Sequence, residues 1–133
     1  MKSTDSKGSI QQTANEIKER GGTCFPIQID QENDDQIAKL FKQIEVEQDG
    51  QLDILVNNAY KAGKALLENR NLKFWESKPE MWDEVNNVGL RSHYFCIVHA
   101  SRLMVPRKQG LIINISSMGG KFYIFNVAYG VGA

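Results

Sequence analysis

Segments in which apolar residues recur at helical spacing alternate along the chain with segments that have the pattern of strands. Residues 4–20 carry isoleucine and alanine at helical spacing and are followed by a glycine pair, which predicts a helix. Residues 24–30 alternate apolar and polar side chains and predict a strand, although Pro26 has no N–H to donate and favours an edge position. A second amphipathic helix is predicted from Ile37 to the Asp49-Gly50 pair.

The middle of the chain holds a short apolar run and then a stretch without periodicity. Residues 52–56, LDILV, are typical of a strand that is buried on both faces. Residues 60–76 show no clean period and are long for a simple connection, so we expect a functional loop or a lid over a site.

A long helix is predicted over residues 78–105. Ser77 and Glu80 have the spacing of a capping box that would open it, while Pro106 and Gly110 would close it. Residues 111–115, LIINI, then predict a third buried strand.

Alternating helices and strands predict an α/β domain with a parallel sheet, spanning residues 1–133 as one unit. Ligands of such sheets bind at the carboxyl ends of the strands. The three predicted strand ends carry small or polar residues: Asp30, then Asn57, Asn58, Ala59 and Tyr60, then Ser116 and Ser117.

Charge and composition narrow the classes of partner. Lys plus Arg number 16 and Asp plus Glu number 16, so the chain lacks the broad positive field that non-specific nucleic-acid binding needs. The N-terminus is polar and no apolar run reaches the roughly 18 residues of a membrane span. We therefore expect no nucleic-acid partner, no membrane span and an intracellular location, in the cytoplasm or associated with an organelle. Cys24 and Cys96 lack metal or redox spacing, and no metal site is expected.

Four features together resemble the short-chain dehydrogenase/reductase family. They are Asp30 closing one strand, LVNNA closing the next, INISS closing the third, and Tyr129 twelve residues after Ser117. Each piece alone is weak, but the combination is specific and covers nearly the whole chain. The resemblance implies a partial Rossmann-like fold, a doubly wound parallel sheet that binds NAD or NADP, and hydride transfer to or from a small carbonyl or alcohol substrate.

The resemblance also implies residue roles. Asp30 would lie beside the adenine, and Asn57 and Ala59 would line the adenosine side of the cofactor. Ser117 would hydrogen-bond the substrate oxygen, and Tyr129 would donate or accept its proton. The residues by themselves leave other readings open, because Asn57 and Ser117 also suit turns and Tyr129 also suits packing.

The chain departs from the family pattern in three places. The lysine expected four residues after the tyrosine falls on Ala133, and the helix asparagine falls on Gly89. The glycine-rich turn that receives the pyrophosphate is missing, so the chain resembles a central slice without the first two strands and the C-terminal strands. In the family's strand order 3-2-1-4-5, those two strands lie between residues 24–30 and 52–56. We therefore expect the 24–30 strand to stay unpaired, to pair directly with the 52–56 strand, or to pair with another chain. We also expect the isolated monomer to have low stability.

Two functions follow from these observations. One is a central fragment of an NAD(P)-dependent short-chain oxidoreductase that is inactive as an isolated chain and whose cofactor binding is in doubt. The alternative is a catalytically silent binding module that pairs with a full-length relative, as a homo- or hetero-oligomer, through the helix predicted at 78–105.

Overall fold

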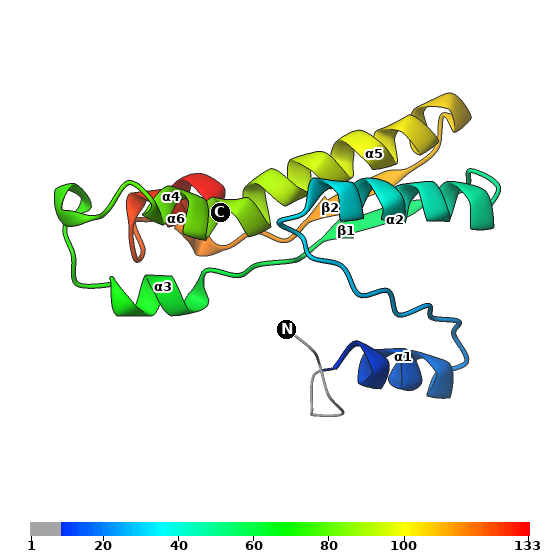
Figure 1. Ribbon diagram of the computed structural model, residues 1–133, viewed down its shortest axis with the longest axis horizontal. Coiled ribbons are helices and arrows are strands. Elements are labelled where there is room, and N and C mark those ends of the chain that lie inside the picture. The colour runs from blue at the N-terminus through cyan, green and yellow to red at the C-terminus, as the bar shows by residue number, and fades with distance from the viewer. Residues whose placement is uncertain (1–8) are drawn as a thin grey trace.

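A small parallel sheet covered by helices forms the centre of the molecule (Figure 1). The structure is a computed structural model, and it describes residues 9–133. Strands β1 (Ile54–Asn57) and β2 (Leu111–Asn114) pair in parallel, with Ile54 opposite Leu111 and Asn57 opposite Asn114. Both strands therefore end at the same edge, where Asn57 and Asn114 are neighbours.

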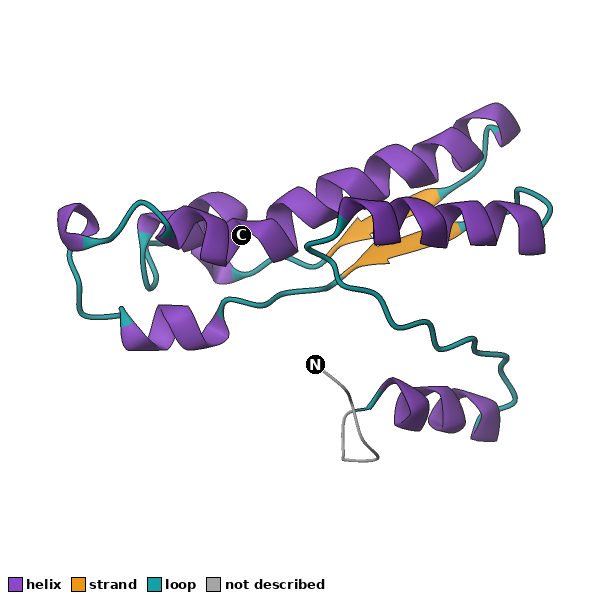
Figure 2. Ribbon diagram, viewed as in Figure 1, coloured by secondary structure: helices purple, strands orange, loops and turns teal. Residues whose placement is uncertain are grey.

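Helices α2 (Asp34–Glu47) and α5 (Ser92–Arg107) cover one face of this sheet (Figure 2). Their buried side chains form the main core, against which Leu55 and Ile112 of the strands pack: Ile37, Phe41, Cys96, Ala100 and Met104. Within the described residues the opposite face has no cover, because Ile54, Val56, Leu111 and Ile113 are exposed. The prediction that both strands are buried on both faces is therefore wrong, although the two strands themselves are found.

Residues 24–30 do not form a strand, contrary to the prediction. They run as an extended segment between α1 (Ile10–Glu19) and α2, and β1 and β2 form the only sheet among residues 9–133 (Figure 1). Phe25 is 69% exposed, so its side chain contributes little to a core. An alternating pattern forms a strand only where a neighbouring strand takes up its backbone hydrogen bonds, and here none lies alongside.

The first helix is found, and it ends at Glu19, close to the predicted end. It begins at Ile10, and the Ser9 hydroxyl caps it by accepting a hydrogen bond from the Gln12 amide at 3.0 Å. The predicted start near Thr4 lies outside the described residues.

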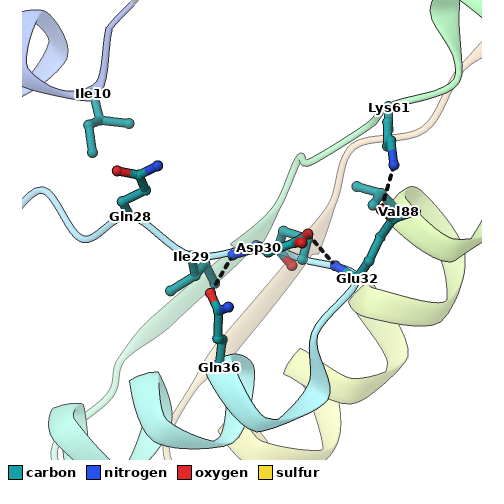
Figure 3. Close-up of a pocket in the computed structure, with 9 residues that line it drawn as sticks. Ile10, Gln28, Ile29, Asp30, Glu32, Gln36, Lys61 and Val88 are labelled. Carbon is teal, nitrogen blue, oxygen red and sulfur yellow. Dashed lines mark hydrogen bonds and ion pairs between the residues drawn. The ribbon is translucent and has the colours of Figure 1, made fainter. Parts of the chain in front are cut away.

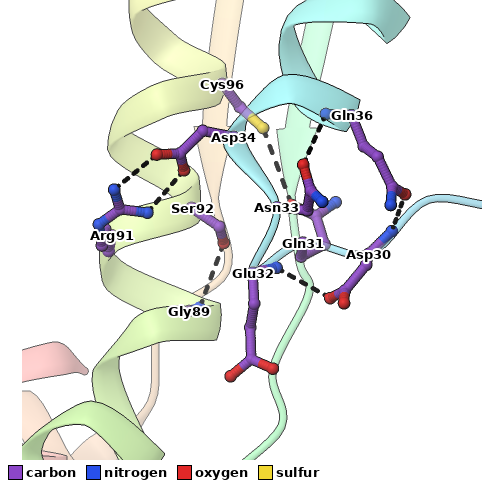
Figure 4. Close-up of polar contacts among 10 residues, drawn as sticks. All are labelled: Asp30, Gln31, Glu32, Asn33, Asp34, Gln36, Gly89, Arg91, Ser92 and Cys96. Carbon is purple, nitrogen blue, oxygen red and sulfur yellow. Dashed lines mark hydrogen bonds and ion pairs between the residues drawn. The ribbon is translucent and has the colours of Figure 1, made fainter.

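The helix predicted over 78–105 is two helices with a bend between them. Helix α4 (Met81–Asn86) leads through a π-helical turn, η2 (Asn87–Arg91), into α5. The bend lies at Val88 and Gly89, whose backbones leave the helical region; Gly89 has φ of 121°, which favours glycine. The Asp34 carboxylate holds Arg91 at the bend through two hydrogen bonds of 2.6 and 2.7 Å (Figure 4).

The predicted start of that helix is wrong, whereas its predicted end lies within two residues of the observed one. Ser77 caps no helix start, because α4 begins at Met81 without a side-chain cap. Pro106 lies inside the last turn of α5, and the chain turns away at Lys108, which has φ of 54°.

The stretch predicted as a loop over 60–76 contains α3 (Gly63–Glu68) and a 3-10 turn, η1 (Phe74–Glu76). Ala62 and Leu66 pack against Met81 and Val85 of α4 in a second small core, which Tyr129 also touches. After β2 the chain forms a 3-10 turn, η3 (Met118–Gly120), and helix α6 (Val127–Gly132). No helix in residues 9–133 has both the length and the apolar character needed to cross a bilayer.

Candidate active site

Ser117 and Tyr129 meet just beyond the end of β2. The Tyr129 hydroxyl donates a hydrogen bond of 2.6 Å to Ser117 Oγ, and the Gly119 amide donates to the same oxygen at 3.0 Å. A serine hydroxyl has two acceptor positions and one proton, so these two donors occupy both acceptor positions. The Ser117 proton is left to donate to a third group, such as a substrate oxygen.

Tyr129 is fixed by the start of α6 and by a glycine beneath its ring. Asn126 caps the helix, and its side-chain oxygen accepts from the Tyr129 amide at 2.9 Å. Asn86 of α4 ties the same helix down by donating to the Ala128 carbonyl at 3.2 Å. A Cβ on Gly119 would lie 2.4 Å from Tyr129 Cε1, so only glycine allows this approach.

A cavity of about 210 Å³ opens beside this pair. Its walls come from the end of β1, the bend at Gly89 and the start of α6, and they include Ala59, Tyr60, Gly89, His93, Ser117 and Tyr129. Ligand pockets usually measure about 300–1,000 Å³, so this cavity suits a small compound.

Two titratable side chains that line the cavity, Tyr60 and His93, stay neutral near pH 7. Burial, and then the neighbouring Tyr129, raise the pKa of Tyr60 to about 12. Burial lowers the pKa of His93, and a hydrogen bond to the Ala59 carbonyl partly offsets it. His93 Nε2 lies 3.0 Å from that carbonyl oxygen, which fits a neutral ring donating from Nε2.

Asp30 lies in a different place. It lines a separate cavity of about 670 Å³ together with Gln28, Lys61 and Val88 (Figure 3). Its carboxylate accepts from the Glu32 amide at 3.0 Å, and its own amide donates to the Gln36 side chain at 2.7 Å (Figure 4). Asp30 is therefore held by the turn that leads into α2, and not by a sheet.

Asn57 is buried, and its side-chain amide donates to Asn114 Oδ1 at 2.8 Å. This contact joins the carboxyl ends of β1 and β2. The structure thus brings Ala59, Ser117 and Tyr129 to one cavity and places Asp30 and Asn57 outside its walls.

The model of the short chain dehydrogenase family matches residues 3–131. The chain belongs to this family. This confirms the family resemblance, and with the solved structures below it also confirms the Rossmann-like α/β fold class, of which the chain covers a part.

Several curated relatives are similar to this chain over nearly all of its length. The chain is 50% identical over 124 residues to human dehydrogenase/reductase SDR family member 1, and 48% identical to the mouse protein. Both alignments cover 93% of the chain and 40% of the relative. A 3-oxoacyl-(acyl-carrier-protein) reductase of Staphylococcus aureus is 34% identical, over 86% of the chain and 44% of the relative. The chain therefore spans less than half the length of these curated relatives.

Two solved structures share the fold. A metagenomic short-chain oxidoreductase in complex with NADP has a TM-score of 0.73 and 27% identity, over 92% of this chain and 53% of that one. A putative gluconate dehydrogenase from Agrobacterium tumefaciens has a TM-score of 0.79 and 25% identity, over 97% of this chain and 48% of that one.

The described residues fit only part of what a dinucleotide needs. The hydroxyls of Ser117 and Tyr129 suit a substrate oxygen, but no lysine or arginine lines their cavity in the part of the chain that the structure describes. Lys61 lines the Asp30 cavity, and its ammonium is paired with Glu32. Nor do residues 9–133 contain a glycine-rich turn leading from a strand into a helix, where a pyrophosphate would bind. The described residues thus bring two hydroxyls together beside a cavity, and they offer no such turn for a pyrophosphate.

Sequence reasoning missed two residues of the cavity. Tyr60 was noted as part of a polar strand end but was given no role. His93 was assigned no role either, and its position one turn after Gly89 is the signal that could have pointed to it.

Proposed function

We propose that this chain forms the carbonyl side of an NAD(P)-dependent oxidoreductase site, acting on a small carbonyl or alcohol compound. Ser117 holds the substrate oxygen, and Tyr129 exchanges the proton on that oxygen. The observation that carries the proposal is the 2.6 Å hydrogen bond from the Tyr129 hydroxyl to Ser117 Oγ, at the carboxyl end of a parallel strand.

The hydrogen-bond arrangement supports these roles. Because Ser117 Oγ already accepts from Tyr129 and Gly119, its own proton can be donated only to another group. A carbonyl oxygen placed within about 3 Å of both hydroxyls would accept a hydrogen bond from Ser117, and the Tyr129 hydroxyl would turn from Ser117 towards that oxygen to give it the phenol proton. In the alcohol direction the same phenol oxygen would receive the proton that the substrate loses.

The cofactor supplies the hydride when it is bound, as NAD or NADP. By the family resemblance we assign Ala59 to its adenosine side, where Ala59 would lie next to the cavity of the reactive pair that it also lines. Asp30 would contact the adenine from its own larger cavity. Asn57 would support the cofactor site indirectly, by holding the carboxyl ends of β1 and β2 together. The solved relative that holds NADP supports this cofactor class by analogy.

We further propose that the isolated chain does not turn over. A tyrosine phenol has a pKa of about 10 in water, so it needs nearby positive charge to act as a base near neutrality. Ala133 stands where the family has its lysine, and the described cavity walls carry no other cation.

The second candidate is a silent module that pairs with a full-length relative. Tyr94 and Val105 favour it, because they are 65% and 70% exposed on α5 and are eleven residues apart, three helical turns along one face. Exposed apolar side chains on one face of a helix suit packing against another chain.

A hydride-transfer assay with NADPH or NADH and cyclohexanone tests the proposed residue roles and the proposed inactivity of the isolated chain. We expect the chain alone to consume no cofactor above the rate without protein. Turnover that S117A and Y129F both abolish would overturn the proposed inactivity, whereas turnover that neither variant changes would overturn the residue roles. Co-elution with a full-length relative that is lost on substituting both Tyr94 and Val105 with serine would support the silent module.

A further inference from the structure

The ring of Tyr129 contacts two other aromatic rings from different parts of the chain. The ring centroids of Tyr60 and Tyr129 are 6.0 Å apart with an interplanar angle of 70°. Phe125 approaches Tyr129 at 5.2 Å and 82°. Both contacts are edge-to-face, which is a favoured arrangement for aromatic pairs. Tyr60 follows β1 and Phe125 precedes α6, so the contacts join two segments that are distant in sequence.

Tyr60 occupies space that a side chain at position 89 would need. A Cβ on Gly89 would lie 2.8 Å from Tyr60 Cδ2, closer than carbon atoms pack. The same glycine has φ of 121°, which disfavours any other residue. Position 89 is where the family's helix asparagine falls by sequence count. A side chain at position 89 and the Tyr60 ring in its present place therefore exclude each other.

Phe125 holds its position at a conformational cost. It has φ of 63°, in the left-handed region where a bulky residue is an outlier. Glycine would adopt this backbone without strain, so a phenylalanine here needs a reason. Its ring packs on Tyr129, and its neighbour Asn126 caps the Tyr129 amide. Strained backbone that persists next to reactive groups commonly serves to position them.

We infer that Tyr60 and Phe125 form an aromatic clamp that positions Tyr129, holding its phenol on Ser117. Both rings of the clamp contact the Tyr129 ring, and the bare backbone of Gly119 approaches the same ring closely. This inference rests on the proposed function, since it assigns a purpose to the fixed place of the phenol. Positioning matters because a displacement of about 1 Å at reacting atoms can cost roughly 100-fold in rate.

The charge state of Tyr60 fits such a role. With a pKa of about 12, Tyr60 stays neutral over the range in which enzymes work, so it adds no negative charge next to the Tyr129 phenol. A neutral ring can then stabilise the geometry without competing for the proton. The same reasoning predicts that phenylalanine can replace Tyr60 in the clamp.

The test measures the ring-flip rate of Tyr129 by NMR of the full chain with ¹³C-labelled tyrosine, the signal being assigned with Y129F. Loss of one aromatic pair should speed flipping about two- to twelvefold in Y60A and in F125G, and Y60F should restore the wild-type rate. F125G keeps the backbone conformation available, so its effect reports the ring and not misfolding. Y94A is the matched control, because Tyr94 is exposed and pairs with Phe95 instead.

Flip rates in Y60A and F125G equal to those of the wild type would overturn the clamp. A second readout, the ¹³C shift of a carbonyl-labelled ketone, separates this failure from failure of the proposed function. Faster flipping in Y60A, with a ketone signal that S117A and Y129F leave unchanged, would keep the clamp and reject the function. Unchanged flipping, with a ketone signal that S117A and Y129F both abolish, would keep the function and reject the clamp.

Discussion

Replacing Gly119 with alanine tests how tightly Tyr129 is placed against Ser117. The new Cβ would lie 2.4 Å from Tyr129 Cε1, and carbon atoms pack at about 3.5–4.0 Å. The ring must therefore retreat by about 1 Å, or the turn must open by as much. The Tyr129 to Ser117 hydrogen bond is 2.6 Å, so a shift of that size takes it beyond the usual limit of about 3.0 Å for two hydroxyls.

Two magnitudes follow from this clash. Overpacking should lower the free energy of unfolding by about 1–3 kcal/mol. Loss of a neutral hydrogen bond is worth about 0.5–1.5 kcal/mol, so a ketone that depends on the pair should bind about two- to twelvefold more weakly. Urea denaturation at 10 °C measures the first quantity, and an NMR shift titration with cyclohexanone measures the second.

The matched control is G63A. Gly63 begins α3, and a Cβ there would meet no atom within 4 Å. We expect unchanged ketone binding and an unchanged or slightly higher urea midpoint, because alanine favours helices. If G119A bound the ketone as the wild type does, with the same urea midpoint, the reasoning about the close approach of Tyr129 would be refuted.

Three further predictions concern the fold. I37A should cost about 2–5 kcal/mol in urea unfolding because Ile37 is fully buried, whereas V46A on the exposed side of the same helix should change it by no more than about 0.5 kcal/mol; equal effects would contradict the assigned core. The raised pKa of Tyr60 means that between pH 10 and 12 the folded state keeps a phenol proton that the unfolded state loses. The contribution of Tyr60 to stability is therefore complete below pH 10 and is lost as pH rises towards 12. Urea midpoints measured from pH 9 to 12 should fall less steeply in Y60F than in the wild type. Because the sheet has two strands and an uncovered apolar face in the described residues, the chain should melt broadly, and a cooperative transition above about 45 °C would count against this.

The sequence predicted the strands better than their surroundings. LDILV and LIINI are apolar enough to form the centre of a sheet in any arrangement, and they pair in parallel as expected. Their burial on both faces depends on neighbours that a local pattern cannot reveal. The strand predicted over residues 24–30 is absent for the same reason. Alternating apolar and polar residues form a strand only when a partner strand takes up their backbone hydrogen bonds.

The bend at Gly89 was hidden by a helical pattern that continues through it. Apolar spacing from Met81 to Leu103 is compatible with a straight helix, and a single glycine is tolerated in one. The need for glycine at position 89 becomes visible only in the structure, where the Tyr60 ring packs against its backbone. Helix α3 had a weak signal, since Ala62 and Leu66 are four residues apart and share a buried face.

The candidate site was predicted in part. The family resemblance implied that Ser117 and Tyr129 act on one substrate oxygen, and the two hydroxyls are in contact. Ala59 lines the same cavity. Asp30 and Asn57 were grouped with them because strand ends of a full sheet converge. Asp30 follows a segment that is not in the sheet, and the side chain of Asn57 is engaged by Asn114, so neither lines that cavity.

The most direct measurement is the ¹³C NMR shift of carbonyl-labelled cyclohexanone added to the chain. Hydrogen bonding to the carbonyl oxygen draws electron density from the carbonyl carbon and moves its signal downfield. The account predicts a saturable downfield shift in the wild type, reduced in S117A and in Y129F and retained in S101A and Y94F, which alter a serine and a tyrosine away from the cavity. A shift that is the same in all five proteins, or absent in the wild type, would contradict the claim that Ser117 and Tyr129 together hold a substrate oxygen.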